Sequence, residues 1–178
     1  MSEVTITPAE THADLNAVRI LCWAYRDHLM TLSQRDRDII EVFYPVPKYT
    51  AILKDLAQLH ARPRGIILLA KDQSGTGVGC GMTHALDEAT SEIKRVYVGP
   101  QARGKGVARQ LCEMLIEQAR RDGFGRVVLD TSKALHTAQR LYHRLGFSPR
   151  GPYQQLPEDV VPDLMFFEKR LSANEGAA

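Results

Sequence analysis

The chain has few cysteines, little net charge and no long apolar run, and each shortage excludes a class of protein. Its three cysteines, Cys22, Cys80 and Cys112, are widely spaced and form no C-x-x-C pair, which argues against a disulfide framework or zinc site and favours a reducing compartment. The formal charge of +2 predicts neither a nucleic-acid nor a membrane partner. No stretch approaches the ~20 apolar residues of a membrane span, and none has the pattern of a secretion signal. We therefore expect a soluble, cytoplasmic protein.

The composition indicates a single globular domain. The 178 residues are 44% hydrophobic and 25% charged, and they contain no repeat, low-complexity segment or linker. We expect this domain to span residues 3–171 and a disordered tail to occupy residues 172–178. The six histidines lack ligand spacing with carboxylates, so no metal site is expected.

Short apolar runs alternate with helical patterns along the chain. Apolar residues recur every three to four positions over 15–29, 49–59, 107–121 and 134–145, whereas strand-like runs cover 4–7, 65–70, 78–85, 92–98, 126–131 and 164–171. The first helix is expected to begin with Thr7 as N-cap, Pro8 at its first position and Glu10 at its third. This order predicts an α/β fold.

The run EIKRVYV (92–98) changes phase along its length. Val96 and Val98 alternate as in a strand, but Ile93 lies three residues before Val96 and would face the opposite side. A one-residue bulge near Lys94 and Arg95 would return all three side chains to one face. Alternatively, both faces of a central strand are covered and its phase carries no information.

The segment VYVGPQARGKGVARQL (96–111) leads from this strand into a helix that has no Ser, Thr, Asp or Asn as its cap. It is not a Walker A loop, because position 106 is glycine where a hydroxyl is required, and Arg109 breaks the dinucleotide fingerprint. Glycines let the backbone approach a ligand closely, and the free N–H groups of a first helical turn attract anions. Gly104 and Gly106, flanked by Arg103 and Lys105, therefore predict a phosphate cradle.

This segment resembles the signature of the GNAT-type N-acetyltransferases, Q/R-x-x-G-x-G/A between a central strand and a helix. Here the signature is Gln101 and Arg103-Gly104-Lys105-Gly106-Val107-Ala108, and LYHRLGF (141–147) follows at the expected place. The order of helices and strands resembles that of the family over roughly residues 4–171, but the motifs match closely only over 92–147. It implies a single domain with a mixed, mostly antiparallel central sheet, helices on both faces and a bulged central strand.

The resemblance also implies acetyl-coenzyme A as cosubstrate, with no metal. The backbone of Val96, Tyr97 and Val98 would accompany the pantetheine arm as an added strand does. The amides of the segment Arg103, Gly104, Lys105, Gly106, Val107 and Ala108 would hold the pyrophosphate. Asp130-Thr131-Ser132 stands where the family often has an asparagine, which leaves the coenzyme contacts on that side open.

Acetyl transfer to an amine requires a base and an acid. Glu92 matches the base of several family members, and Tyr142 matches the tyrosine that faces the coenzyme sulfur; a carboxylate and a phenol suit these roles. A strand N–H near Val96 or Val98 could meet the negative charge that develops on the carbonyl oxygen. Each side chain also has a structural interpretation: Tyr142 as a core aromatic, and Glu92 as an exposed strand carboxylate paired with Lys94 or Arg95.

The sequence thus predicts an N-acetyltransferase that moves an acetyl group to a primary amine of a small molecule or peptide through a ternary complex. The alternatives are a non-catalytic acyl-coenzyme A-binding module and an acyltransferase for longer chains. The sequence leaves the oligomeric state open, a homodimer included. Acceptor specificity is expected from residues 25–64 and from those after Phe147, which with their flanks supply Trp23, Arg26, Phe43, Tyr44, Tyr49 and Tyr153. This aromatic set is accompanied by few carboxylates, which favours a small or anionic acceptor over a polycationic peptide.

Overall fold

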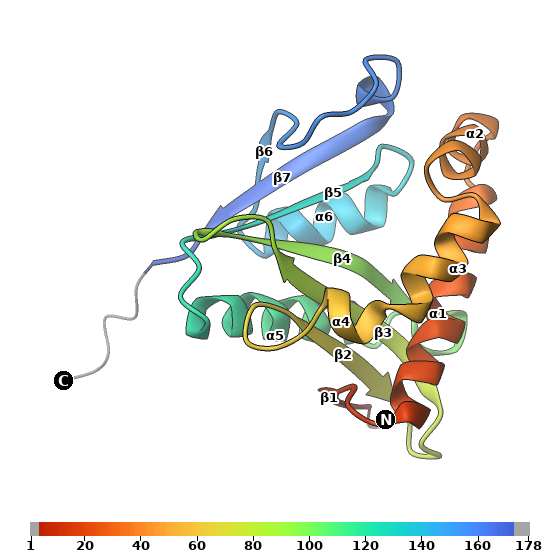
Figure 1. Cartoon of the computed structure of the whole chain (residues 1–178), viewed down its shortest axis with the longest axis vertical. Coiled ribbons are helices and arrows are strands. Elements are labelled where there is room, and N and C mark those ends of the chain that lie inside the picture. The colour runs from red at the N-terminus through yellow and green to blue at the C-terminus, as the bar shows by residue number, and fades with distance from the viewer. Residues whose placement is uncertain (1–3, 173–178) are drawn as a thin grey trace.

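The computed structural model describes residues 4–172, which form seven strands, six α-helices and two short 3-10 helices (Figure 1). The strands are β1 (Thr5–Pro8), β2 (Ile66–Lys71), β3 (Gly77–Ala85), β4 (Thr90–Val98), β5 (Arg126–Ser132), β6 (Ser148–Arg150) and β7 (Leu164–Arg170). The helices are α1 (His12–Met30), α2 (Gln34–Phe43), α3 (Val46–Lys54), α4 (Leu56–Leu59), α5 (Val107–Arg121) and α6 (His136–Arg144), with η1 (Pro100–Ala102) and η2 (Val161–Asp163).

All seven strands belong to one sheet, in the order β1-β2-β3-β4-β5-β7-β6. Every neighbouring pair is antiparallel except β4 and β5, which are parallel. The α/β class and the mixed, mostly antiparallel sheet predicted from the sequence are therefore confirmed.

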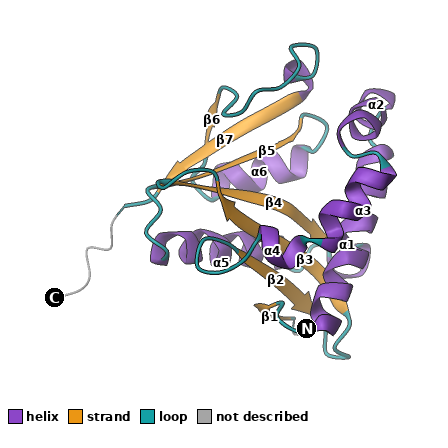
Figure 2. Cartoon of the chain, in the orientation of Figure 1, coloured by secondary structure: helices purple, strands orange, loops and turns teal. Residues whose placement is uncertain are grey.

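Helices cover both faces of the sheet (Figure 2). On β2, Ile66 and Leu68 pack into the core beneath α5 and α6, whereas Ile67 and Leu69 pack against α1 and α3 on the other face. Both faces of β2 are buried, and its near-continuous apolar run follows from this position. In the part of the chain that the structure describes, no helix is long and apolar enough to cross a membrane.

The bulge predicted in the central strand is present. Cys80 pairs with Tyr97 and Met82 with Lys94, so two residues of β4, Arg95 and Val96, face Gly81 alone. Arg95 takes a φ of 53°, which is uncommon for a residue with a side chain. Beyond the bulge, Val96 and Val98 pack against the same core cluster as Ile93, so the bulge keeps the three apolar side chains on one face.

β4 and β5 pair only at one end. Their register runs from Thr90 opposite Arg126 to Glu92 opposite Val128 and then stops. Past that point the two strands separate (Figure 1). The side of β4 that faces β5 after Glu92 therefore lacks a partner strand.

Two local expectations differ from the structure. β1 continues through Pro8, and the first helix begins at His12, capped by a reciprocal pair of hydrogen bonds between Thr11 and Asp14 rather than by Thr7. Helix α2 and the short strand β6 were not predicted; α2 carries five charged residues among ten, which hides its narrow apolar side. Residues 173–178 of the expected tail lie outside the described residues.

Candidate active site

Two cavities meet where β4 and β5 separate. One, of about 350 Å³, lies between α1, α2, the bulge of β4 and the end of β5, and we call it the acceptor cavity. The other, of about 1120 Å³, runs from β4 along the start of α5 to α6, and we call it the coenzyme groove. Four residues line both cavities: Tyr25, Val96, Thr131 and Tyr142. A group bound in one cavity can therefore reach a group bound in the other.

The coenzyme groove contains the open start of α5. Gly106 is the N-cap residue of this helix, and no side chain caps its first turn. Gly104 and Gly106 have φ values of 76° and 77°, which side chains rarely adopt. A Cβ at Gly104 would meet no atom within 4 Å, so the backbone there is open to a ligand. The free N–H groups and the helix dipole make this turn suitable for a phosphate.

Most of the residues expected to hold the coenzyme pyrophosphate line the groove, but Lys105 does not. Gly104, Gly106, Val107 and Ala108 line the groove, as do four arginines, namely Arg103, Arg109, Arg140 and Arg144. The Arg103 guanidinium also donates to the Val98 carbonyl at 3.1 Å. Lys105 does not line the groove, because its ammonium turns back to the Gln101 carbonyl at 3.0 Å. The Val107 side chain is buried in the core, so only its backbone could serve a ligand.

The bulged end of β4 lines the groove through Val96, Tyr97 and Val98. This stretch has no pairing with β5, so its backbone groups on that side remain available to an extended ligand. Tyr97 packs its ring among the residues beneath α1, which leaves its backbone as the part suited to such a ligand.

Tyr142 lies at the junction of the two cavities. Its ring packs against Phe147 and Phe167, with centroid distances of 5.9 and 5.7 Å, and only 7% of the residue is exposed. Burial, followed by the nearby Cys112, Tyr25 and Asp130, raises the pKa of its hydroxyl well above the ordinary value. Tyr142 thus keeps its proton at any working pH and could donate it to a group at the junction. The Tyr142 ring thus belongs to the core, and the same residue also lines both cavities.

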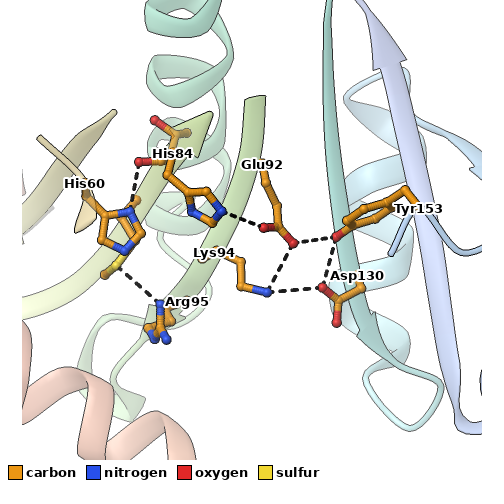
Figure 3. Close-up of polar contacts among 9 residues, drawn as sticks. His60, His84, Glu92, Lys94, Arg95, Asp130 and Tyr153 are labelled. Carbon is orange, nitrogen blue, oxygen red and sulfur yellow. Dashed lines mark hydrogen bonds and ion pairs between the residues drawn. The ribbon is translucent and has the colours of Figure 1, made fainter. Parts of the chain in front are cut away.

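Glu92 is the centre of a buried polar network (Figure 3). The Tyr153 hydroxyl donates to Glu92 Oε1 at 2.7 Å and Lys94 Nζ lies 3.1 Å from the same atom, while His84 Nε2 lies 3.0 Å from Oε2. The network extends to Asp130, which is 3.0 Å from the Tyr153 hydroxyl and 3.4 Å from Lys94 Nζ. Because β4 and β5 separate here, these side chains fill the space between the strands.

The structural alternative described Glu92 as an exposed strand carboxylate paired with Lys94 or Arg95. The pair with Lys94 is present, but the side chain is buried. The residue is 2% exposed and lines neither cavity. Burial by itself raises the pKa of Glu92, but the hydrogen bond with His84, the Lys94 charge and the Tyr153 hydroxyl outweigh it and lower the pKa to about 2. Glu92 is therefore ionised and in no direct contact with either cavity.

Part of the aromatic set that the sequence singled out lines the acceptor cavity. Arg26, Phe43, Tyr44 and Tyr49 line it. Trp23 lies behind this wall, edge-on to Tyr49 at 5.0 Å, and Tyr153 belongs to the network around Glu92. Two carboxylates, Asp36 and Asp130, also line the cavity.

Several lining residues were missed from the sequence. Asp130 was noted only as a departure from the family pattern, and its place beside Lys94 and Tyr153 depends on pairing between distant segments. Arg140 and Arg144 could have been found from the sequence, because a spacing of four residues places both side chains on one side of a helix. All three cysteines are buried, and none lines either cavity. No cluster suited to a metal ion occurs within residues 4–172.

Comparisons with known proteins agree with this geometry. Residues 27–147 match the model of the Acetyltransferase (GNAT) family. An uncharacterized N-acetyltransferase of Schizosaccharomyces pombe is 30% identical over 96% of this chain and 97% of its own length, and an IAA acetyltransferase of Azospirillum brasilense is 39% identical over 67% and 76%. A Klebsiella pneumoniae protein assigned as an acyl-CoA N-acyltransferase superposes with a TM-score of 0.67 at 28% identity, covering 97% of this chain and 99% of its own. A Salmonella typhimurium protein assigned as an acetyltransferase and solved with its cofactor acetyl-CoA gives 0.66 at 24% identity, covering 99% and 98%.

Proposed function

Because the chain belongs to the GNAT family of acetyltransferases, we propose that it transfers the acetyl group of acetyl-coenzyme A to the primary amine of a small molecule. The observation that carries this proposal is the meeting of the two cavities at Tyr142, Val96 and Thr131. The groove offers an uncapped helix start and arginines to the diphosphate, and a cavity of about 350 Å³ suits a small acceptor better than a peptide.

The cavities favour direct transfer in a ternary complex. A covalent acetyl-enzyme would need a nucleophile at the junction, and Cys22, Cys80 and Cys112 line neither cavity. In direct transfer the amine nitrogen attacks the thioester carbon and the carbon–sulfur bond breaks. Tyr142 donates its proton to the departing sulfur, and a free N–H of β4 near Val96 or Val98 stabilises the negative carbonyl oxygen.

The proton of the attacking amine leaves through the polar network. Asp130 faces the acceptor cavity, whereas Glu92 lies behind it and shares Lys94 and Tyr153 with it. We assign Asp130 the contact with the amine, and Glu92 a place further along the proton path. Glu92 thus acts through Asp130 and Tyr153 rather than by touching the amine.

A thiol-release assay tests the proposal. The protein is mixed with acetyl-coenzyme A and a panel of amines, amino acids and peptides, and free coenzyme A is followed with a thiol reagent. The expected result is release that depends on both an acceptor and Tyr142. Tight binding of acetyl-coenzyme A without release, either to any amine or to water, would instead identify a non-catalytic binding module. Hexanoyl-coenzyme A in place of acetyl-coenzyme A tests for a longer acyl group.

A further inference from the structure

The acceptor cavity contains two guanidinium groups without an acidic partner. Arg26, on α1, is 7% exposed; its Nε donates to the Tyr44 carbonyl at 2.9 Å and Nη1 lies 3.1 Å from the Met30 sulfur. Arg95, at the bulge of β4, lies 5.9 Å from the Tyr49 ring centroid and 4.0 Å from the Met82 sulfur. Among residues 4–172, neither guanidinium forms an ion pair with a carboxylate.

These cations gather at one side of the cavity. Arg26 donates to the backbone carbonyl of Tyr44, Arg95 lies near the ring of Tyr49, and the rings of the two tyrosines are 5.7 Å apart. The neighbouring Lys94 differs, because it turns toward Glu92 and Asp130, away from Arg95 (Figure 3). The Lys94 charge is therefore balanced within the protein, whereas the charges of Arg26 and Arg95 are not.

Arg26 is buried and Arg95 is half-buried. A cation withdrawn from water without a counter-charge is costly, so such groups normally face an anionic ligand. A guanidinium presents a planar fork of donors that matches a carboxylate. The other side of the cavity carries Asp130 beside Tyr142, where an ammonium group would sit before transfer. Asp36, the other carboxylate of the cavity, also lies on the β5 side, where the Ser132 hydroxyl donates to it at 2.5 Å. The cavity thus has a negative side along the end of β5 and a positive side on the aromatic wall.

We propose that the acceptor is an amine that also carries a carboxylate, an amino acid, and that Arg26 and Arg95 bind this carboxylate while the amine faces Asp130. The inference rests on the proposed acetyl transfer and names the substrate class of the same site. Recognition of the carboxylate by charged donors should favour an amino acid over the matched amine by about 10- to 100-fold in kcat/KM.

The test compares matched acceptors with and without a carboxylate. Leucine is paired with 3-methylbutylamine, and 6-aminohexanoate with hexylamine, so that the carboxylate lies close to the amine or far from it. The parent should prefer the carboxylate in at least one pair by 10-fold or more. A selectivity ratio near one in both pairs, with the amines acetylated, would overturn the inference and leave the proposed function intact.

Arg95→Met and Arg26→Met remove each guanidinium while keeping most of the side-chain length. Both should lower the selectivity ratio toward one. Arg19→Met is the matched control, because Arg19 also lies on α1 and also donates from Nε to a backbone carbonyl, that of Leu53, at 2.8 Å, but lines neither cavity. An unchanged ratio in folded Arg95→Met would overturn the inference, and melting temperatures of all three variants identify any loss of folding.

Calorimetric binding of leucine and of 6-aminohexanoate gives a readout independent of turnover. Binding by the parent that is lost in Arg95→Met but kept in Arg19→Met would support the carboxylate site even if no acetyl group were transferred, in which case only the proposed function would fail. Equal binding by all variants would refute the site.

Discussion

Replacing Tyr142 by phenylalanine separates the catalytic interpretation of this residue from the structural one. The phenylalanine ring keeps the contacts with Phe147 and Phe167, and only the hydroxyl is lost. No described residue hydrogen-bonds that hydroxyl, so its removal leaves no protein partner unsatisfied. We expect the free energy of unfolding to change by less than about 1 kcal/mol, which corresponds to a shift in melting temperature of about 2–4 °C at most.

The effect on turnover should be far larger. A positioned acid contributes about 10²–10⁴-fold to a rate, and the low end applies because a thiolate is already a fair leaving group. A loss of about 10²-fold in kcat corresponds to about 2.7 kcal/mol of transition-state stabilisation. Burial and the neighbouring Cys112, Tyr25 and Asp130 raise the pKa of Tyr142, so the parent keeps this proton throughout the accessible pH range. The loss should therefore be the same at pH 6 and at pH 9.

The assay measures kcat and KM by thiol release, the affinity for acetyl-coenzyme A by calorimetry and the melting temperature, all on one preparation. An interaction made only in the transition state lowers kcat and kcat/KM together and leaves KM for acetyl-coenzyme A nearly unchanged. Parent turnover in a slightly destabilised Tyr142→Phe protein would refute the reasoning and return the residue to the core. A loss confined to KM would indicate a role in binding instead.

Three further predictions concern the proton path, the phosphate cradle and a buried histidine. Glu92→Gln should lower kcat/KM by about 10²-fold, most strongly at low pH, where the amine most needs to lose a proton; an acidic limb identical to the parent's would remove Glu92 from the proton path. Gly106→Trp should abolish binding of acetyl-coenzyme A, as measured by calorimetry. Gly123 also has a positive φ and lies at the other end of α5, so Gly123→Trp should lower stability by a similar amount and leave binding intact. Burial lowers the pKa of His60 to about 4 despite its bond with the Thr83 carbonyl, so the folded state resists protonation. The stability that depends on neutral His60 is complete above pH 6.5, and the free energy of unfolding falls by about 3 kcal/mol as the pH drops toward 4. Urea unfolding at pH 7 and 4.5 should show a smaller fall in this free energy for His60→Gln than for the parent. Equal falls in the two proteins would contradict the lowered pKa of His60.

Local patterns in the sequence were sufficient for much of the fold and for the open turn at the start of α5. Some signals depend only on residues that are close in the sequence, and they can be interpreted without the tertiary structure. They include the apolar run of β2, the periodic helices and the glycines at 104 and 106. The phase change between Ile93 and Val96 is also local; it left a bulge and a strand covered on both faces as alternatives, and the structure contains the bulge. The expected cap at Thr7 was wrong, because Thr7 pairs with Leu69 in the sheet and the first helix begins only after Thr11.

The surroundings of Glu92 and the acceptor cavity were decided only by the tertiary structure. Glu92, Asp130 and Tyr153 come from segments far apart in the chain, and they meet because β4 and β5 separate and the loop after β6 returns over the opening. Whether a carboxylate is exposed or buried, and whether an arginine has a partner, depends on contacts that no local pattern encodes. The pKa of Glu92 and the unbalanced charges of Arg26 and Arg95 follow from those contacts, because burial and neighbouring charge set the energy of an ionised group.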